Sequence, residues 1–93
     1  MIRHIVMWKF CEGTEAEQEQ FLSGLAALQG VIPQLKKSEV ARNVGEDNYD
    51  AVLVSEFESM EMLEQYKNDP RHKAISDLCK SIRVDRVAVD YEF

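Results

Sequence analysis

In three segments of the chain, residues 2–11, 49–57 and 84–93, successive side chains alternate between two sets, as they do on the two faces of a β-strand. The clearest is 49–57. Segment 2–11 is largely apolar at both sets of positions, which favours a strand that is covered on both faces. A further strand is expected at 35–44, because the Ile32-Pro33 step favours extended backbone and a short turn then leads into 49–57.

Apolar residues at helical spacing predict helices between these strands. The first covers about residues 15–29, the second is a short helix that starts after Ser59, and the third covers about 70–81. The apolar stripe of the first helix consists of Phe21, Leu22, Leu25, Ala26 and Leu28. In the second helix, Met60, Leu63 and Tyr66 are expected to point inward.

Polar residues mark the ends of these helices. Thr14 and Glu17 have the form of a capping box at the start of the first helix, and Gly30 is a natural stop after it. Ser59 is a favourable N-cap. Asp69 followed by Pro70 predicts that the second helical region breaks and restarts, with proline at the first position of the new helix.

The order strand, helix, strand, strand, helix, strand predicts a ferredoxin-like βαββαβ fold of the α+β class, as a single domain over residues 1–93. Right-handed crossovers place both helical regions on one face of a four-stranded antiparallel sheet. The other face is left bare. A chain of this length gains from burying more surface, so we expect a second copy to cover this face and form a homodimer through it.

The charge and composition narrow the possible partners. The chain has 17 Asp and Glu against 11 Lys and Arg, which gives a formal charge of −6. Such a chain repels phosphate backbones, so no nucleic-acid partner is expected. The RNA-recognition fold has the same element order, but residues 49–52 lack its basic and aromatic run. No apolar run approaches the roughly 20 residues of a membrane helix, so we expect a cytoplasmic protein without a membrane partner.

Several kinds of site are not expected. The four glycines stand alone, which argues against a phosphate-binding loop and a nucleotide cofactor. The two histidines lie on different elements without metal-ligand spacing, so neither a metal site nor another cofactor is predicted. Cys11 and Cys79 are interpreted as reduced, partly buried thiols.

Tyr66, His72 and His4 are the residues of greatest chemical interest. Tyr66 and His72 lie on the apolar sides of consecutive helices, so both can point between the helices and the sheet. His4 joins them if its face of the first strand lies under the helices. Two imidazoles and a phenol in one half-buried space can bind a polar ring or move protons near neutral pH. The simpler alternative is that His72 bonds to the backbone and only fixes the helix junction.

Short stretches across the whole chain carry a family resemblance: residues 4–10, 12–14, 32–33, 44–45, 49–50, 57–59, 66, 70–72 and 89–91. Their order and spacing resemble the stress-responsive α/β-barrel (Dabb) domain family. The resemblance implies a ferredoxin-like monomer that pairs into a dimeric α+β barrel. In a plant polyketide cyclase that shares this fold, a tyrosine and a histidine act as an acid/base pair, and their positions match Tyr66 and His72. A further pocket histidine matches His4.

The resemblance also shows departures from that cyclase. Ala51 and Leu25 stand where the cyclase has a histidine and a tyrosine, and the bulky Trp8 replaces a smaller aliphatic residue. The acid/base pair is therefore retained in a different environment.

Three functions remain open at this point. The first is a homodimeric stress-response domain that binds a small hydrophobic or aromatic molecule near His72, with His4, Val6, Trp8, Leu25 and Ala51 as the candidate ligand-binding residues. The second is an acid/base enzyme of the cyclase, isomerase or cofactor-free monooxygenase type, with His72 and Tyr66 as catalytic residues. The third is a structural oligomerisation module whose functional surface is the bare sheet face.

Overall fold

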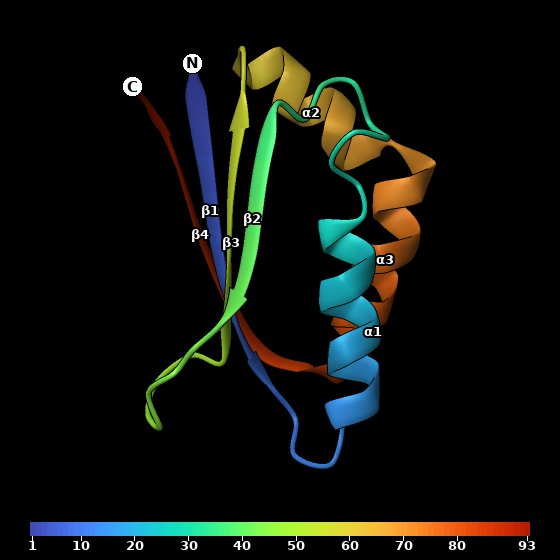
Figure 1. Cartoon of the computed structure of the whole chain (residues 1–93), viewed down its shortest axis with the longest axis vertical. Helices are drawn as coiled ribbons and strands as arrows, with labels where there is room; N and C mark the ends of the chain where they lie inside the picture. The colour runs from blue at the N-terminus through green and yellow to red at the C-terminus, as the bar shows by residue number, and fades with distance from the viewer.

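The computed structural model describes all 93 residues, and it places three helices on one side of a four-stranded antiparallel sheet (Figure 1). The elements are, in chain order, β1 (Ile2–Phe10), α1 (Glu15–Ala26), β2 (Lys37–Arg42), β3 (Ala51–Phe57), α2 (Met60–Asn68), α3 (Pro70–Ile82) and β4 (Arg83–Glu92). The strands lie side by side in the order β2-β3-β1-β4. This arrangement confirms the predicted βαββαβ fold, with α2 and α3 together forming the second helical region.

Local hydrogen bonds explain why that second helical region starts, breaks and restarts. The Ser59 side chain accepts a bond from the backbone N–H of Met62 at 3.2 Å. Asp69 accepts one from the backbone N–H of Arg71 at 2.8 Å, and Pro70 takes the first helical position, where a missing N–H leaves no bond unmade. Both predicted caps are confirmed. None of the helices is both long and apolar enough to span a membrane.

The capping box predicted at Thr14 and Glu17 is wrong. The Thr14 hydroxyl donates to the carbonyl oxygen of Cys11 at 2.6 Å and accepts from the Gln18 side chain at 3.0 Å. It therefore makes no bond to a backbone N–H of α1. The helix also ends at Ala26 rather than near residue 29, because the chain continues from there in a series of turns.

Three further details differ from the prediction. Strands β2 and β3 are shorter than 35–44 and 49–57, because residues 43–50 form their connection, which is closed by a backbone bond from Asn43 N–H to the Asp50 carbonyl at 2.9 Å. In α2, Leu63 and Tyr66 point inward as expected. Met60 does not, since it is 44% exposed.

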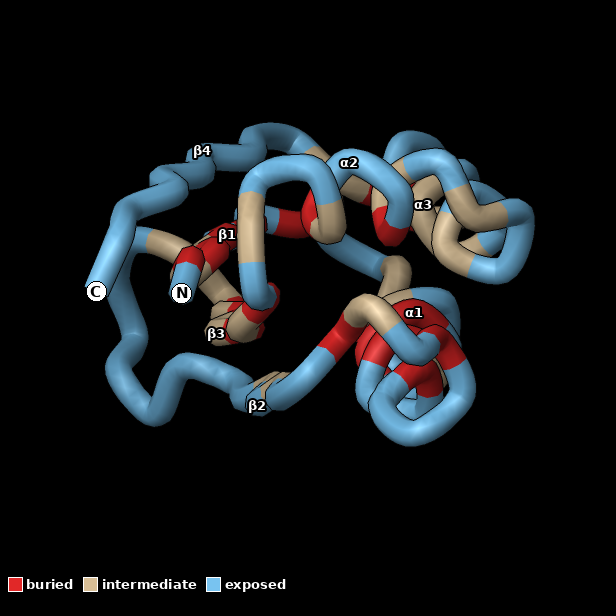
Figure 2. The backbone as a smooth tube through the Cα atoms, turned by 90° about the horizontal axis from the view of Figure 1, so that it is seen from above, coloured by how far each residue is buried: buried red, intermediate tan, exposed pale blue.

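Seventeen buried apolar residues form the core. Figure 2 shows buried segments on β1, β3 and the helices, whereas β4 is exposed along nearly all of its length. The face of β1 that carries Val6, Trp8 and Phe10 lies under the helices, and Trp8 meets the ring of Phe21 edge-on with 5.0 Å between centroids. Strand β4 differs from β1 and β3, because none of its residues is buried. The core is therefore incomplete between α3 and β4.

No helix covers the other face of the sheet (Figure 1). The strand register places two apolar rows at its centre, Val54–Ile5–Val89 and Val52–Met7–Val87. The next row toward the chain termini is polar and contains an ion pair between Arg3 and Glu56 at 3.1 Å. We refer to these rows as the uncovered face. An apolar centre with a charged rim is the usual anatomy of a protein interface.

Candidate functional site

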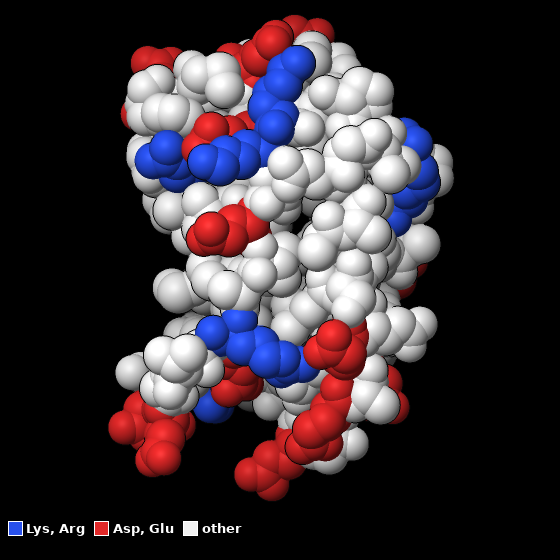
Figure 3. Space-filling view, viewed as in Figure 1, with Lys and Arg blue, Asp and Glu red and all other residues white.

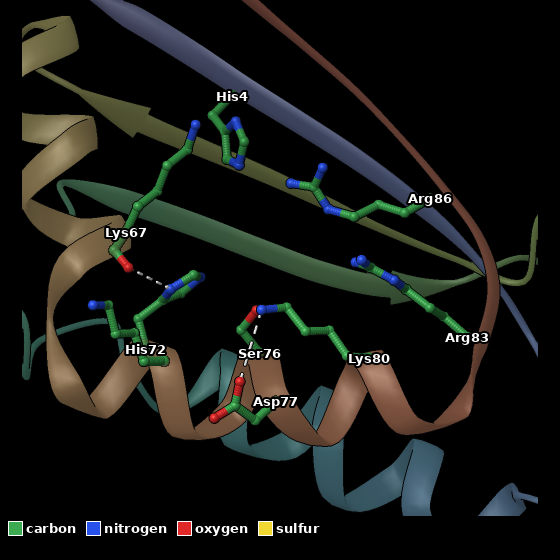
Figure 4. A pocket seen from close by; sticks show the side chains of 9 residues that line it. His4, Lys67, His72, Ser76, Asp77, Lys80, Arg83 and Arg86 are labelled. Carbon is green, nitrogen blue, oxygen red and sulfur yellow. Dashed lines mark hydrogen bonds and ion pairs between the residues drawn. The ribbon is translucent and has the colours of Figure 1, made fainter.

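A hollow of about 540 Å³ opens between α3 and the helix-facing side of β4. We call it the outer hollow. Nine side chains line it and none of them is hydrophobic: His4, Lys67, His72, Lys73, Ser76, Asp77, Lys80, Arg83 and Arg86. Figure 4 shows the two histidines on opposite walls, with lysine and arginine side chains directed toward the space between them.

An inner cavity of about 40 Å³ adjoins the outer hollow on the side of the core. Five residues line both spaces: His4, His72, Ser76, Arg83 and Arg86. The inner cavity is closed by Val6, Trp8, Phe21, Leu25, Leu53 and Cys79. It has room for a few non-hydrogen atoms. The two spaces together suit a molecule with a small apolar end and a larger polar part.

The hydrogen bond of His72 fixes its tautomer. Its Nδ1 lies 3.3 Å from the carbonyl oxygen of Lys67. Because a carbonyl oxygen can only accept, Nδ1 carries the proton and Nε2 keeps a free lone pair. Burial lowers the pKa of His72; the hydrogen bond to the Lys67 carbonyl opposes this effect, while the nearby charges of His4, Arg86 and Lys67 add to it, and the net shift is downward. At neutral pH the side chain is therefore a neutral imidazole that can accept a proton at Nε2.

Tyr66 lies against His72 and lines neither space. The centroids of the Tyr66 and His72 rings are 4.5 Å apart. Tyr66 also packs against Phe57, with 5.1 Å between their ring centroids. The Tyr66 hydroxyl makes no hydrogen bond. Since every fully buried polar side-chain atom has a partner, this hydroxyl must retain a trace of solvent access. Burial raises the pKa of Tyr66, so the phenol stays protonated and can donate.

His4 is held by Asp90 on the neighbouring strand. The register of β1 and β4 places the two residues directly opposite each other, and the Asp90 carboxylate accepts a hydrogen bond from Nδ1 of His4. Burial lowers the pKa of His4, while the hydrogen bond and charge of Asp90 act in the opposite direction. A carboxylate that holds Nδ1 leaves Nε2 as the free nitrogen of the ring.

The structure brings most of the predicted site residues together. His4, Val6, Trp8, Leu25 and His72 all line the inner cavity. Ala51 does not. It lies under the helices opposite Trp8 and borders a different depression, near the connection between β2 and β3. A cavity beside His72 is therefore present, and its assignment to a ligand is a proposal taken up below.

Sequence reasoning missed three parts of this site: Asp90, Ser76 and the cationic side chains of the outer hollow. The alternation of residues 84–93 already places Arg86 and Asp90 on one face of that strand. The sequence does not reveal the pairing register between β1 and β4, which brings Asp90 to His4. Lys80 and Arg83 belong to α3 and the start of β4, so their approach depends on how the two elements pack.

Neither a metal nor a reactive thiol is indicated by the arrangement. No three His, Cys, Asp or Glu side chains gather closely enough to hold a metal ion. Cys11 and Cys79 are both free. Burial raises the pKa of the Cys79 thiol, so it is protonated at neutral pH and a poor nucleophile.

The fold and the cavity define a class of protein: a ferredoxin-like domain with a histidine-lined pocket between its helices and its sheet. The sequence profile of the Stress responsive A/B Barrel Domain (Dabb) family matches residues 2–93, and the chain belongs to this family.

Three known proteins illustrate the similarity. Olivetolic acid cyclase of Cannabis sativa is 28% identical over 95 residues, which cover 97% of this chain and 94% of that enzyme. An uncharacterized protein of Streptomyces coelicolor is 32% identical over 98 residues, which cover both chains completely. A crystal structure of a dimeric ferredoxin-like protein of unknown function from Bacteroides fragilis has a TM-score of 0.91 and 26% identity, with 99% of this chain and 95% of that chain covered.

Proposed function

We propose that the chain binds a small carbonyl compound in the outer hollow and inner cavity, and that His72 acts on it as a general base. The observation that carries this proposal is the His72 tautomer: a neutral imidazole with a free Nε2 lines both spaces. The apolar lining of the inner cavity suits a small hydrophobic end of the ligand. The reacting carbon then lies at the boundary between the two spaces, beside His72.

The proposed step is proton abstraction next to a carbonyl group. Nε2 of His72 takes the proton, the C–H bond breaks, an N–H bond forms, and the electron pair moves into an enolate whose charge lies on oxygen. The Tyr66 hydroxyl lines neither space, so its donation to that oxygen requires the phenol to turn toward the ligand; the ring packs against His72, and the phenol is protonated and has no partner in the protein. His72 later returns its proton to the product or to water, so the step needs no oxidant or reductant.

The relative from Cannabis sativa supports a reaction of this class, because its name describes it as a cyclase. Closing a ring between two carbonyl-bearing parts of one molecule can begin with such an enolate. Its substrate is not transferred to this chain, since Leu25 and Trp8 give the pocket different walls from those that the family resemblance leads us to expect, and Ala51 lies outside the pocket.

We also propose that the functional unit is a homodimer joined through the uncovered face. The Bacteroides fragilis neighbour is a dimeric protein of the same fold. The two apolar rows of this face expose large side chains in the single chain, including Val89 at 55% and Met7 at 39%. The outer hollow opens on the helix side of the sheet, so a dimer of this kind leaves it accessible.

Exchange of carbon-bound hydrogen for deuterium tests the catalytic proposal. Levulinate and benzylacetone both carry acidic C–H bonds beside a ketone, and their exchange in D₂O is followed by proton NMR. We expect the native chain to accelerate exchange of at least one of them, and the rate to fall at a pH below the pKa of His72. The variant His72→Gln should lose about two to four powers of ten in rate.

The exposed residue Glu61 provides a control, because Glu61→Gln changes α2 on its solvent side and should leave the rate unchanged. Circular dichroism of each variant establishes that it is folded. A folded His72→Gln variant with the native rate contradicts the role of His72. A native chain that accelerates exchange of neither ketone contradicts the enzyme proposal.

A further inference from the structure

The charge of the outer hollow is opposite to the charge of the chain. Acidic residues outnumber basic ones by 17 to 11 overall. In the lining of the hollow, five residues are basic and one is acidic. The face shown in Figure 3 carries both signs, with acidic side chains gathered at the end where α1 begins. Cations are thus concentrated in one concave space of an otherwise acidic molecule.

The arginines of this space are also the ones that lack a carboxylate partner. Arg3, Arg42 and Arg71 each pair with a carboxylate of the chain, at 3.1, 3.3 and 2.7 Å. Arg83 and Arg86 form no ion pair. Clustered, unpaired guanidinium groups repel one another, and a planar anion with two oxygens matches their geometry.

The lysines of the hollow leave room for an anion as well. The ammonium of Lys80 is 3.8 Å from Asp77, and that of Lys67 is 3.7 Å from Glu64. Both pairs connect solvent-accessible side chains on neighbouring turns of a helix, where such contacts are weak. Lys73 forms no ion pair. An anion in the hollow therefore competes only with weak ion pairs of these lysines.

We propose that the outer hollow binds an anionic group, a carboxylate or a phosphate, of the molecule whose carbonyl reaches His72. This inference rests on the proposed function and names its substrate class: an organic anion with an enolisable carbonyl. Arg83 and Arg86 line both spaces, so they hold the anion at the point where the ligand turns inward. The same cations stabilise the negative charge of the enolate.

The chemistry of His72 is linked to this site. The charge of Arg86 contributes to the lowered pKa of His72 and of His4. A bound anion neutralises that charge. The NMR titration midpoint of His72 should therefore move to higher pH when an anion binds, which provides a reading of occupancy at the site itself.

Binding of three probes with the same ring tests the proposal: benzoate, phenyl phosphate and the uncharged benzamide. We expect the native chain to bind benzoate, phenyl phosphate or both at least about tenfold more tightly than benzamide. The preferred anion identifies the group as carboxylate or phosphate. In the double variant Arg83→Gln/Arg86→Gln, the affinity for the preferred anion should fall by about tenfold or more. The control Arg42→Gln should keep the native affinity, because Arg42 pairs with Glu19 on α1, away from the outer hollow.

Equal binding of benzamide and both anions overturns the proposal, and so does native affinity in a folded Arg83→Gln/Arg86→Gln variant. The exchange experiment separates this result from the catalytic one. If the anions bind but levulinate does not exchange, the role of His72 as a general base is rejected and the anion site is supported. If exchange of levulinate and of the neutral benzylacetone is accelerated equally, the anion site is rejected and the general base is supported.

Discussion

Ile5 lies at the centre of the uncovered face, between Val54 on β3 and Val89 on β4. If two copies meet through this face, the substitution Ile5→Glu places a carboxylate in the middle of the interface. On a single chain the same side chain points to water, so the cost there is a fraction of a kcal/mol from strand propensity. The dimer is therefore affected far more than the fold.

The size of the effect follows from the burial of an unpaired charge. Breaking a buried ion pair so that one charge is left alone costs about 3–5 kcal/mol, and an introduced lone carboxylate is a comparable case. A two-fold interface contains the change twice, once from each copy. At about 1.4 kcal/mol for each factor of ten, the dimer dissociation constant should rise by on the order of a hundredfold or more.

Analytical ultracentrifugation over a range of micromolar concentrations measures this change. The native chain should sediment at twice its mass of 10.7 kDa, and Ile5→Glu should shift toward the single mass with an unchanged circular dichroism spectrum. Val44→Glu is the matched control, because Val44 is fully exposed in the connection between β2 and β3. A dimer that is equally stable in both variants refutes the assignment of the interface to this face.

Three other substitutions and conditions test the site and its support. Tyr66→Phe removes only the hydroxyl and should slow levulinate exchange about tenfold or more, whereas an unchanged rate limits Tyr66 to packing under His72. The free energy of unfolding should fall as the pH drops below about 7.5, because unfolded histidine takes up a proton around pH 6.5 and folded His72, whose pKa is lowered, takes it up only at lower pH. Urea titrations should show a flatter dependence in His72→Gln, and equal slopes contradict this reading. Ser59→Ala should cost about 1 kcal/mol in the same titrations, and no loss would show that the N-cap bond is dispensable.

The parts of the fold that sequence reasoning predicted are those decided by neighbours in the chain. Alternation in 49–57 reflects burial on one face of a strand, and the caps at Ser59 and Asp69 depend on bonds two or three residues away. The capping box at Thr14 failed because a competing local partner was available. Its hydroxyl bonds to the carbonyl oxygen of Cys11, which precedes it in the same turn.

The candidate site was predicted in part, for a related reason. The sides of helices and strands can be read from periodicity, so His4, His72 and Leu25 could be placed on the inside. The contact of His4 with Asp90 joins two residues 86 positions apart in sequence, and it requires the register between their strands. The cationic outer hollow requires in addition that α3 and β4 stay apart, which is a property of packing that no local pattern contains.

The proposed chemistry depends on a neutral His72 ring that presents a free Nε2 to the pocket. Nitrogen-15 NMR of the imidazole measures this without knowledge of the ligand. In the native chain near neutral pH, we expect Nδ1 to carry the proton and Nε2 to carry none, and we expect the titration midpoint to lie below the ordinary histidine value of about 6.5. A protonated Nε2 in the neutral ring, or a midpoint above that value, would contradict the role of His72 as a general base.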